Sequence, residues 1–170
     1  MSTPVAGSYP PYFFNYINLV ETVSIADAIK KYSKYINVFF LQISEEKSTY
    51  RYAENKWSIK EMLQHIIDAE RIFAFRALSI ARGEQTPLPG FEENDYAAAS
   101  KADNRNWQSL TEEFVATRKS TDLMLQSFTD EQLDSSGTTN GHSNTAVAIA
   151  YVIFGHALHH IAVVKEKYLV

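Results

Sequence analysis

The chain has 170 residues, enough for one domain with a substantial core, and its 45% apolar and 21% charged residues are typical of globular proteins. A formal net charge of −4, without any block of Lys and Arg, argues against nucleic-acid binding, which needs clustered cations. Because the chain has no cysteine, it cannot form a disulfide, a thiolate metal site or a cysteine nucleophile, so any metal must be held by His, Asp or Glu.

The hydropathy pattern argues against a membrane or secreted protein. No apolar run approaches the roughly 20 residues that a membrane-spanning helix needs. The first twenty residues contain no basic segment followed by an apolar one, so they do not match a secretory signal. We therefore expect a cytoplasmic protein without membrane contacts.

Residues 1–23 are rich in Pro, Tyr and Phe. Pro4, Pro10 and Pro11 oppose a regular helix, because proline lacks the backbone N–H that helices need. We predict an extended N-terminal arm whose aromatic side chains pack on the body of the protein. Residues 24–170 are assigned to a single domain.

The first predicted helix begins after Ser24, a good capping residue, and runs from about residue 25 to residue 44. A polar connection follows it. Its apolar residues recur every three or four positions, as in an amphipathic helix: Ile25, Ala28, Ile29, Tyr32, Ile36, Phe39, Phe40 and Ile43.

The second predicted helix has the clearest start in the chain. Ser58 and Glu61 match the S-x-x-E capping box, and Trp57 and Met62 occupy the hydrophobic positions that flank such a box. The helix is expected to end at Gly83, since glycine is common just beyond helix C-termini.

Three polar residues of this helix are candidates for a site. His65 flanks the apolar stripe, and Glu70 projects from its middle, where a carboxylate should be paired or bound to a metal. Pairing with a nearby Arg or Tyr is the commoner case. Asp68 is one turn from His65 and can accept a hydrogen bond from its ring only if the ring turns toward it.

Residues 83–104 contain Pro87, Pro89 and Gly90, which predict a loop with one short helical turn after Asn94. A third helix is expected from about residue 106 to residue 128. Its apolar face is formed by Trp107, Leu110, Phe114, Thr117, Thr121, Leu125 and Phe128.

Thr129 and Gln132 form a weak capping box for a brief helical turn. The following residues 135–144, SSGTTNGHSN, are typical of a flexible, turn-rich loop. This loop contains His142, and a histidine in such a position is expected to be exposed to solvent.

A fourth helix is predicted from about residue 145 to residue 168, and it contains three of the five histidines. His156 and His160 lie one turn apart within an apolar stripe, whereas His159 lies toward its edge. Two imidazoles at this spacing on a buried face can bind one metal ion, with a third ligand from His65 or His142. The alternative is a pair of core histidines that hydrogen-bond to their neighbours.

Four long helices without alternating strands predict an all-α protein, a four-helix bundle. Metal sites in bundles are built from side chains on facing helices. His65 can therefore meet His156 and His160 if the second and fourth helices are neighbours.

The run KWSIKEMLQHIIDAERIFAFRALSIARGEQTPLPGFEENDY and the later GHALHHI resemble the DinB-like superfamily, in particular its DinB-2 branch. The resemblance extends from about residue 25 to residue 168. It implies a bundle with an up-down-down-up arrangement, often dimeric, and a divalent metal held by three histidines. These histidines correspond to His65, His156 and His160, while His159 matches a position that does not usually bind the metal.

Characterised members of this superfamily include thiol-dependent S-transferases and isomerases, and others are labelled metal-dependent hydrolases. The resemblance therefore implies a Zn- or Ni-dependent homodimeric enzyme that transfers a low-molecular-weight thiol to an electrophilic small molecule. Hydrolysis by an activated water is the alternative reaction, with Glu70 and Asp68 as weak candidates for acid/base groups. A non-catalytic, stress-related module that binds a metal or a small molecule is the alternative class.

Overall fold

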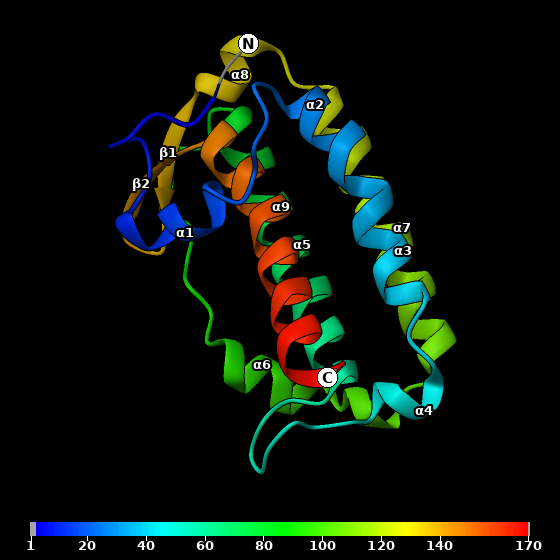
Figure 1. Cartoon of the computed structure of the whole chain (residues 1–170). Helices are drawn as coiled ribbons and strands as arrows, with labels where there is room; N and C mark the ends of the chain where they lie inside the picture. Colours follow the sequence, from blue (N-terminus) through cyan, green and yellow to red (C-terminus); the bar gives the residue numbers. More distant parts are fainter. Residues whose placement is uncertain (1–2, 170) are drawn as a thin grey trace.

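The computed structural model describes residues 3–169 and forms a four-helix bundle (Figure 1). Each of the four predicted long helices is present, with ends within a few residues of the expected ones. The first and last each include one π-helical turn, at Ile29–Ser33 and Val164–Tyr168. The bundle helices are α2 (Ile25–Ala28) continuing into α3 (Lys34–Leu41), α5 (Ile59–Ala81), α7 (Trp107–Gln126) and α9 (Ala146–Val163).

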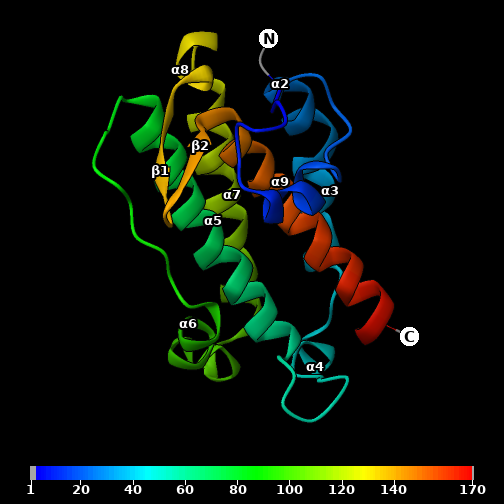
Figure 2. The ribbon, with the colours of Figure 1, turned by 90° about the vertical axis from the view of Figure 1, so that its left-hand side faces the viewer.

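The helices follow the up-down-down-up order. In Figure 1, α2 and α3 run downward, α5 and α7 both run upward, and α9 runs downward. α5 packs against α7 and α9, and α3 packs against the same two helices on the other side. Because α5 and α7 are parallel, the chain between them returns along the full length of the bundle (Figure 2). This connection contains α6 (Glu93–Ser100) and a 3-10 turn (Ala102–Asn104).

Side-chain caps fix where the helices begin. Ser58 accepts a hydrogen bond from the Glu61 backbone N–H at 3.1 Å, and Glu61 accepts one from the Ser58 N–H at 2.9 Å, so the predicted capping box is confirmed. Ser24 caps α2 as expected, and a second capping box begins the short α8 (Asp130–Asp134). Another short helix, α4 (Glu45–Ser48), lies in the connection before α5.

The prediction of an extended N-terminal arm is wrong for its central part. Residues Pro11–Phe13 form a 3-10 turn that leads into α1 (Phe14–Ile17), and proline is tolerated there because the first N–H groups of a helix have no intrahelical partner. Phe13 and Ile17 are buried in the same core as the bundle, and α1 packs against α9. The first segment is therefore part of the body of the protein.

Close packing of this segment requires Gly155 in α9. A Cβ atom at this position would lie 2.0 Å from the carbonyl oxygen of Tyr16. No side chain fits in that gap, because real Cβ contacts are never so short. The glycine lets the backbone of α1 lie directly on α9, one residue before His156.

The prediction of a flexible loop at residues 135–144 is also wrong. The segment forms a hairpin of β1 (Ser136–Thr139) and β2 (His142–Thr145), paired antiparallel. Asn140 and Gly141 at its tip have positive φ angles of 50° and 75°, which the two-residue hairpin turn requires. Leu88 donates its backbone N–H to the hairpin at 2.9 Å, so the start of the long connection is tied to it.

The prediction that no apolar stretch is long enough for a membrane span needs a correction. Residues Ala146–Tyr168 pass that test by length and composition. However, 72% of their most apolar stretch is buried inside the protein, as in the central helix of a bundle. Among the described residues this is the single helix that qualifies.

A buried charge cluster joins three helices in the bundle. Arg118 of α7 is fully buried, its Nη2 lies 3.2 Å from Oε1 of Glu70 on α5, and its guanidinium lies 4.7 Å from the ring of Phe154 on α9. Its Nε lies 3.6 Å from Asp122 one turn along α7. Burial raises the pKa of Glu70, and the nearby Arg118 opposes that rise. Glu70, expected to be paired or bound to a metal, is thus paired.

We predict that Arg118→Met lowers the free energy of unfolding by about 3–5 kcal/mol, because it leaves Glu70 buried without a counter-charge. Urea denaturation at neutral pH measures the effect. The double variant Arg118→Met/Glu70→Leu should recover much of this loss, because no uncompensated carboxylate remains at position 70. A loss below about 1 kcal/mol in the single variant would show that the pairing contributes little.

Candidate metal centre

His65 of α5 meets His156 and His160 of α9 inside the bundle. The Nε2 atom of His156 lies 3.0 Å from Nε2 of His65 and 3.0 Å from Nε2 of His160. One potential ligand atom from each ring lies within 4.8 Å of the other two. The predicted convergence of these three residues is therefore what the structure shows, and it follows from the direct packing of α5 on α9.

The spacing of the nitrogen atoms suits a single ion. Ligands about 2.1 Å from one metal lie about 3.0 Å apart at right angles and about 3.4 Å apart at the tetrahedral angle. Without an ion the arrangement is poorly matched, because the one lone pair or N–H of His156 Nε2 faces two other imidazoles. The Nδ1 atom of His160 is buried and has no hydrogen-bond partner among residues 3–169, so none of these residues fixes the tautomer of that ring.

Burial keeps the three imidazoles neutral, which is the form that binds metals. It lowers the pKa of His65 from 6.5 to about 4. Burial also lowers the pKa of His156 and His160 well below the ordinary value, and the neighbouring histidines lower both further. The chemistry of this donor set, three neutral nitrogen ligands, fits Zn²⁺ or Ni²⁺.

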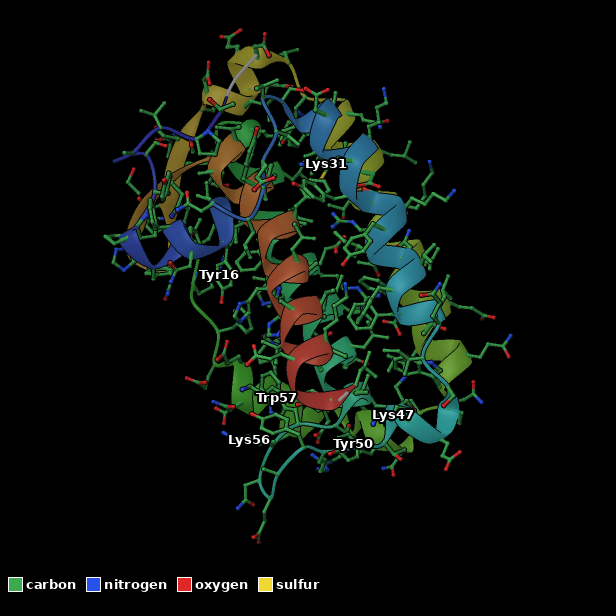
Figure 3. The ribbon with its side chains drawn as sticks, viewed as in Figure 1. Tyr16, Lys31, Lys47, Tyr50, Lys56 and Trp57 are labelled. Atoms are coloured by element: carbon green, nitrogen blue, oxygen red, sulfur yellow. The ribbon has the colours of Figure 1, made fainter. Side chains whose placement is uncertain are left out.

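Aromatic rings surround the cluster. The Trp57 ring lies 4.8 Å from that of His65, and Tyr16 and Phe73 lie 5.5 Å and 5.7 Å from the ring of His156. Tyr16 comes from α1 and Trp57 from the residue before the α5 cap, as labelled in Figure 3. These rings cover part of the histidine cluster.

A cavity of about 180 Å³ opens beside the cluster, and His65 and His156 form part of its wall. The other walls come from α1, from the hairpin tip and from the long connection after α5. Besides the two histidines, the polar and charged residues that line the cavity are Tyr12, Tyr16, Arg76, Glu93 and Asn140. A substrate in the cavity would thus lie against two of the three histidines.

The remaining candidates lie outside this cavity wall. Glu70 pairs with Arg118 in the core, and Asp68 accepts a hydrogen bond from the side chain of Gln64 at 2.9 Å. His159 is exposed and touches the ring of Tyr16 at 5.5 Å. His142 is exposed on the hairpin, as expected.

Most of the cavity wall was not predicted from the sequence. Tyr12, Glu93 and Asn140 belong to segments that were predicted as an arm and as loops, so nothing assigned them to one place. Arg76 had a usable signal, because it follows His65 by about three helical turns and shares its face of α5. The pair Asn140–Gly141 was also a recognisable hairpin signal.

A family model for the DinB superfamily matches residues 34–164. The chain belongs to the DinB superfamily. The family resemblance expected from the two histidine segments is therefore confirmed. No curated protein matches the chain significantly.

Two solved structures from Bacillus subtilis share the fold of this DinB-superfamily protein. YfiT, described as a probable metal-dependent hydrolase with an unusual four-helix bundle topology, matches with a TM-score of 0.72 and 15% identity, over 86% of this chain and 89% of its own. The DinB-like protein YjoA matches with a TM-score of 0.60 and 21% identity, over 85% of this chain and 89% of its own. At these identities the likeness establishes the four-helix bundle alone.

We predict that His160→Ala abolishes stoichiometric binding of a divalent ion, because only two imidazoles then remain. The exposed neighbour offers a matched control: His159→Ala should bind the ion like the wild type. Metal content after dialysis and calorimetric titration measure both. A chelator should leave the helical circular dichroism of the wild type largely unchanged, because the apolar core does not depend on the ion. Extensive unfolding on chelation would instead indicate a structural metal.

We also predict that the metal-free protein loses stability as the pH falls from about 6.5 toward 4. The unfolded chain then binds a proton at His65 that the folded chain, with its lowered pKa, does not bind. Between pH 7.5 and pH 5 this residue alone contributes a loss of about 2 kcal/mol. Urea denaturation of the wild type and of His65→Gln at both pH values isolates the effect. Equal losses in the two proteins would contradict the prediction.

Proposed function

We propose that the protein is a metal-dependent enzyme that acts on a small molecule, and that hydrolysis is its reaction. The observation that carries this proposal is the place of the three-histidine cluster at the wall of a cavity. A purely structural ion is usually enclosed by four protein ligands, whereas three ligands beside an open space are typical of catalytic sites. The cavity also counts against a module in which the ion is purely structural.

His65, His156 and His160 would hold the ion, with Zn²⁺ and Ni²⁺ as the best candidates. When bound, such an ion lowers the pKa of a water or a thiol and so supplies a nucleophile at neutral pH. The surrounding rings of Trp57 and Phe73 strengthen electrostatic interactions in the site by keeping bulk water away.

Glu93 is a better candidate for proton transfer than Glu70 or Asp68. Among the described residues that line the cavity, it is the one carboxylate. Burial and the charge of Glu93 raise the pKa of Tyr16, so this phenol keeps its proton and can donate a hydrogen bond to a substrate oxygen. Glu93 can accept a proton from the nucleophile and return it to the leaving group.

Hydrolysis is preferred to thiol transfer because YfiT carries the description of a probable metal-dependent hydrolase. Thiol transfer rests on the family resemblance, and it needs an external thiol, since the chain has no cysteine. Neither of the two related structures is described as a thiol transferase.

The test is an activity screen of untagged protein loaded with Zn²⁺ or Ni²⁺. Chromogenic esters, amides and phosphate esters are assayed without thiol, and electrophilic substrates with low-molecular-weight thiols. Turnover without thiol that disappears with a chelator and returns with the ion supports hydrolysis. Turnover that requires a thiol would replace hydrolysis by transfer, and turnover unaffected by chelation would refute a metal-dependent enzyme.

We predict that Glu93→Gln lowers kcat of the metal-loaded enzyme by about 10²- to 10⁴-fold, the usual contribution of general acid/base catalysis. Metal content should stay unchanged, because Glu93 is not among the three clustered residues. Asp95→Asn, which removes an exposed carboxylate from the same helix, is the control and should keep full activity. A Glu93→Gln variant with wild-type kcat would exclude the proposed role.

A further inference from the structure

We propose that Arg76 binds the anionic head group, a carboxylate or a phosphate, of a compact substrate with an apolar middle. The inference rests on the proposed function, because it places the reacting part of that substrate at the histidine cluster. It adds the chemical class of the substrate to the reaction. Three properties of Arg76 support the proposal: its burial, the absence of a counter-ion among the described residues, and its position on α5.

Arg76 is a buried arginine without a counter-ion. Arg76 is 5% exposed, and its side chain lines the cavity beside His65 and His156. Within the described part of the chain, Arg76 forms no ion pair, whereas the other buried arginine, Arg118, has two carboxylates near it. A buried guanidinium is always charged and is costly without an anion. A bound anion would supply the missing partner.

The guanidinium of Arg76 is held in place, but most of its N–H groups have no hydrogen-bond acceptor among the described residues. Its Nη2 donates a hydrogen bond to the carbonyl oxygen of Pro89 at 2.7 Å, the one hydrogen bond that it forms among residues 3–169. Its Cζ atom lies 5.8 Å from the ring of Phe73 and 5.9 Å from the ring of Phe91. These contacts orient the planar group and leave N–H donors for an oxyanion, which arginine binds through two parallel hydrogen bonds.

The position of Arg76 sets where a substrate would lie. His65, Ala69, Phe73 and Arg76 follow one another at intervals of three or four residues along α5, so they share one face. The Phe73 ring contacts Arg76 at one end and the ring of His156, at 5.7 Å, at the other. An apolar or aromatic substrate body would pack on Phe73, with its anion at Arg76 and its reacting group at the histidines.

Glu93 in the cavity wall carries a negative charge, which opposes the positive charge of Arg76. It is exposed, whereas Arg76 is buried, so the field of Glu93 is more strongly screened by water. A divalent ion at the histidines would make the cavity net positive. An anionic substrate is therefore favoured over a neutral or cationic one.

The experiment is calorimetric titration with three probes of similar shape: phenylacetate, phenyl phosphate and the neutral phenylacetamide. The proteins are the wild type, Arg76→Met, Arg76→Lys, and the control Arg82→Met, which removes an exposed arginine from the end of the same helix. Each is titrated without metal and with Zn²⁺, and circular dichroism verifies its fold. We expect at least one anion to bind the wild type tenfold or more tightly than the amide, with or without the ion.

Arg76→Met should weaken anion binding at least tenfold and Arg82→Met should not change it. The anion affinity of Arg76→Lys should lie between those of the wild type and Arg76→Met, because an ammonium keeps the charge but not the paired hydrogen bonds. Arg76→Lys also replaces Arg76→Met as the test variant if Arg76→Met does not fold. The preference between the two anions identifies the head group. Equal binding of anion and amide, or unchanged binding in Arg76→Met and Arg76→Lys, would overturn the inference.

The same titrations separate this inference from the proposed function. His160→Ala should lose Zn²⁺ binding but keep binding of the anion, because Arg76 is untouched. If Zn²⁺ binds and the anions do not, the role of Arg76 is refuted while the metal site remains. If the anions bind and Zn²⁺ does not, the proposed function fails while the anion site remains.

Discussion

The contact between α5 and α9 is the interaction on which the rest of the structure depends. It brings His65 against His156 and His160, so it creates the candidate metal centre and also fills the middle of the core. In the up-down-down-up order, α5 lies between its partners α9 and α7 and runs parallel to α7. The long return connection that this order requires supplies one wall of the cavity.

Among the buried polar residues of the described core, three groups are compensated in different ways. The Arg118 cluster is neutralised by carboxylates, and it holds three helices together. The histidines are kept neutral by burial and face one another. The guanidinium of Arg76 donates a hydrogen bond to the Pro89 carbonyl oxygen and lies near the rings of Phe73 and Phe91. Arg118 has carboxylates near it, whereas Arg76, which lines the cavity, has no carboxylate partner among the described residues, as expected where an external anion binds.

The sequence predicted those features that depend on local chemistry. The capping box at Ser58 and Glu61, the helical periodicity and the i, i+4 spacing of His156 and His160 are each contained within one or two turns. The four-residue α1 was missed because so short a helix is unstable alone and exists here through packing on α9. The cavity wall was missed for the same reason, since Glu93 and Asn140 come to line one cavity with the histidines only through long-range packing.

The absence of a side chain at Gly155 has a consequence for the chemistry of the neighbouring histidine. The distance between the backbones of α1 and α9 is set there, because the Tyr16 carbonyl occupies the space that a Cβ atom would need. Tyr16 reaches the ring of His156 from that backbone. Gly155 thus sets how closely the Tyr16 ring can cover His156, although the glycine itself has no side chain. The surroundings of a candidate ligand therefore depend on a residue outside the cluster.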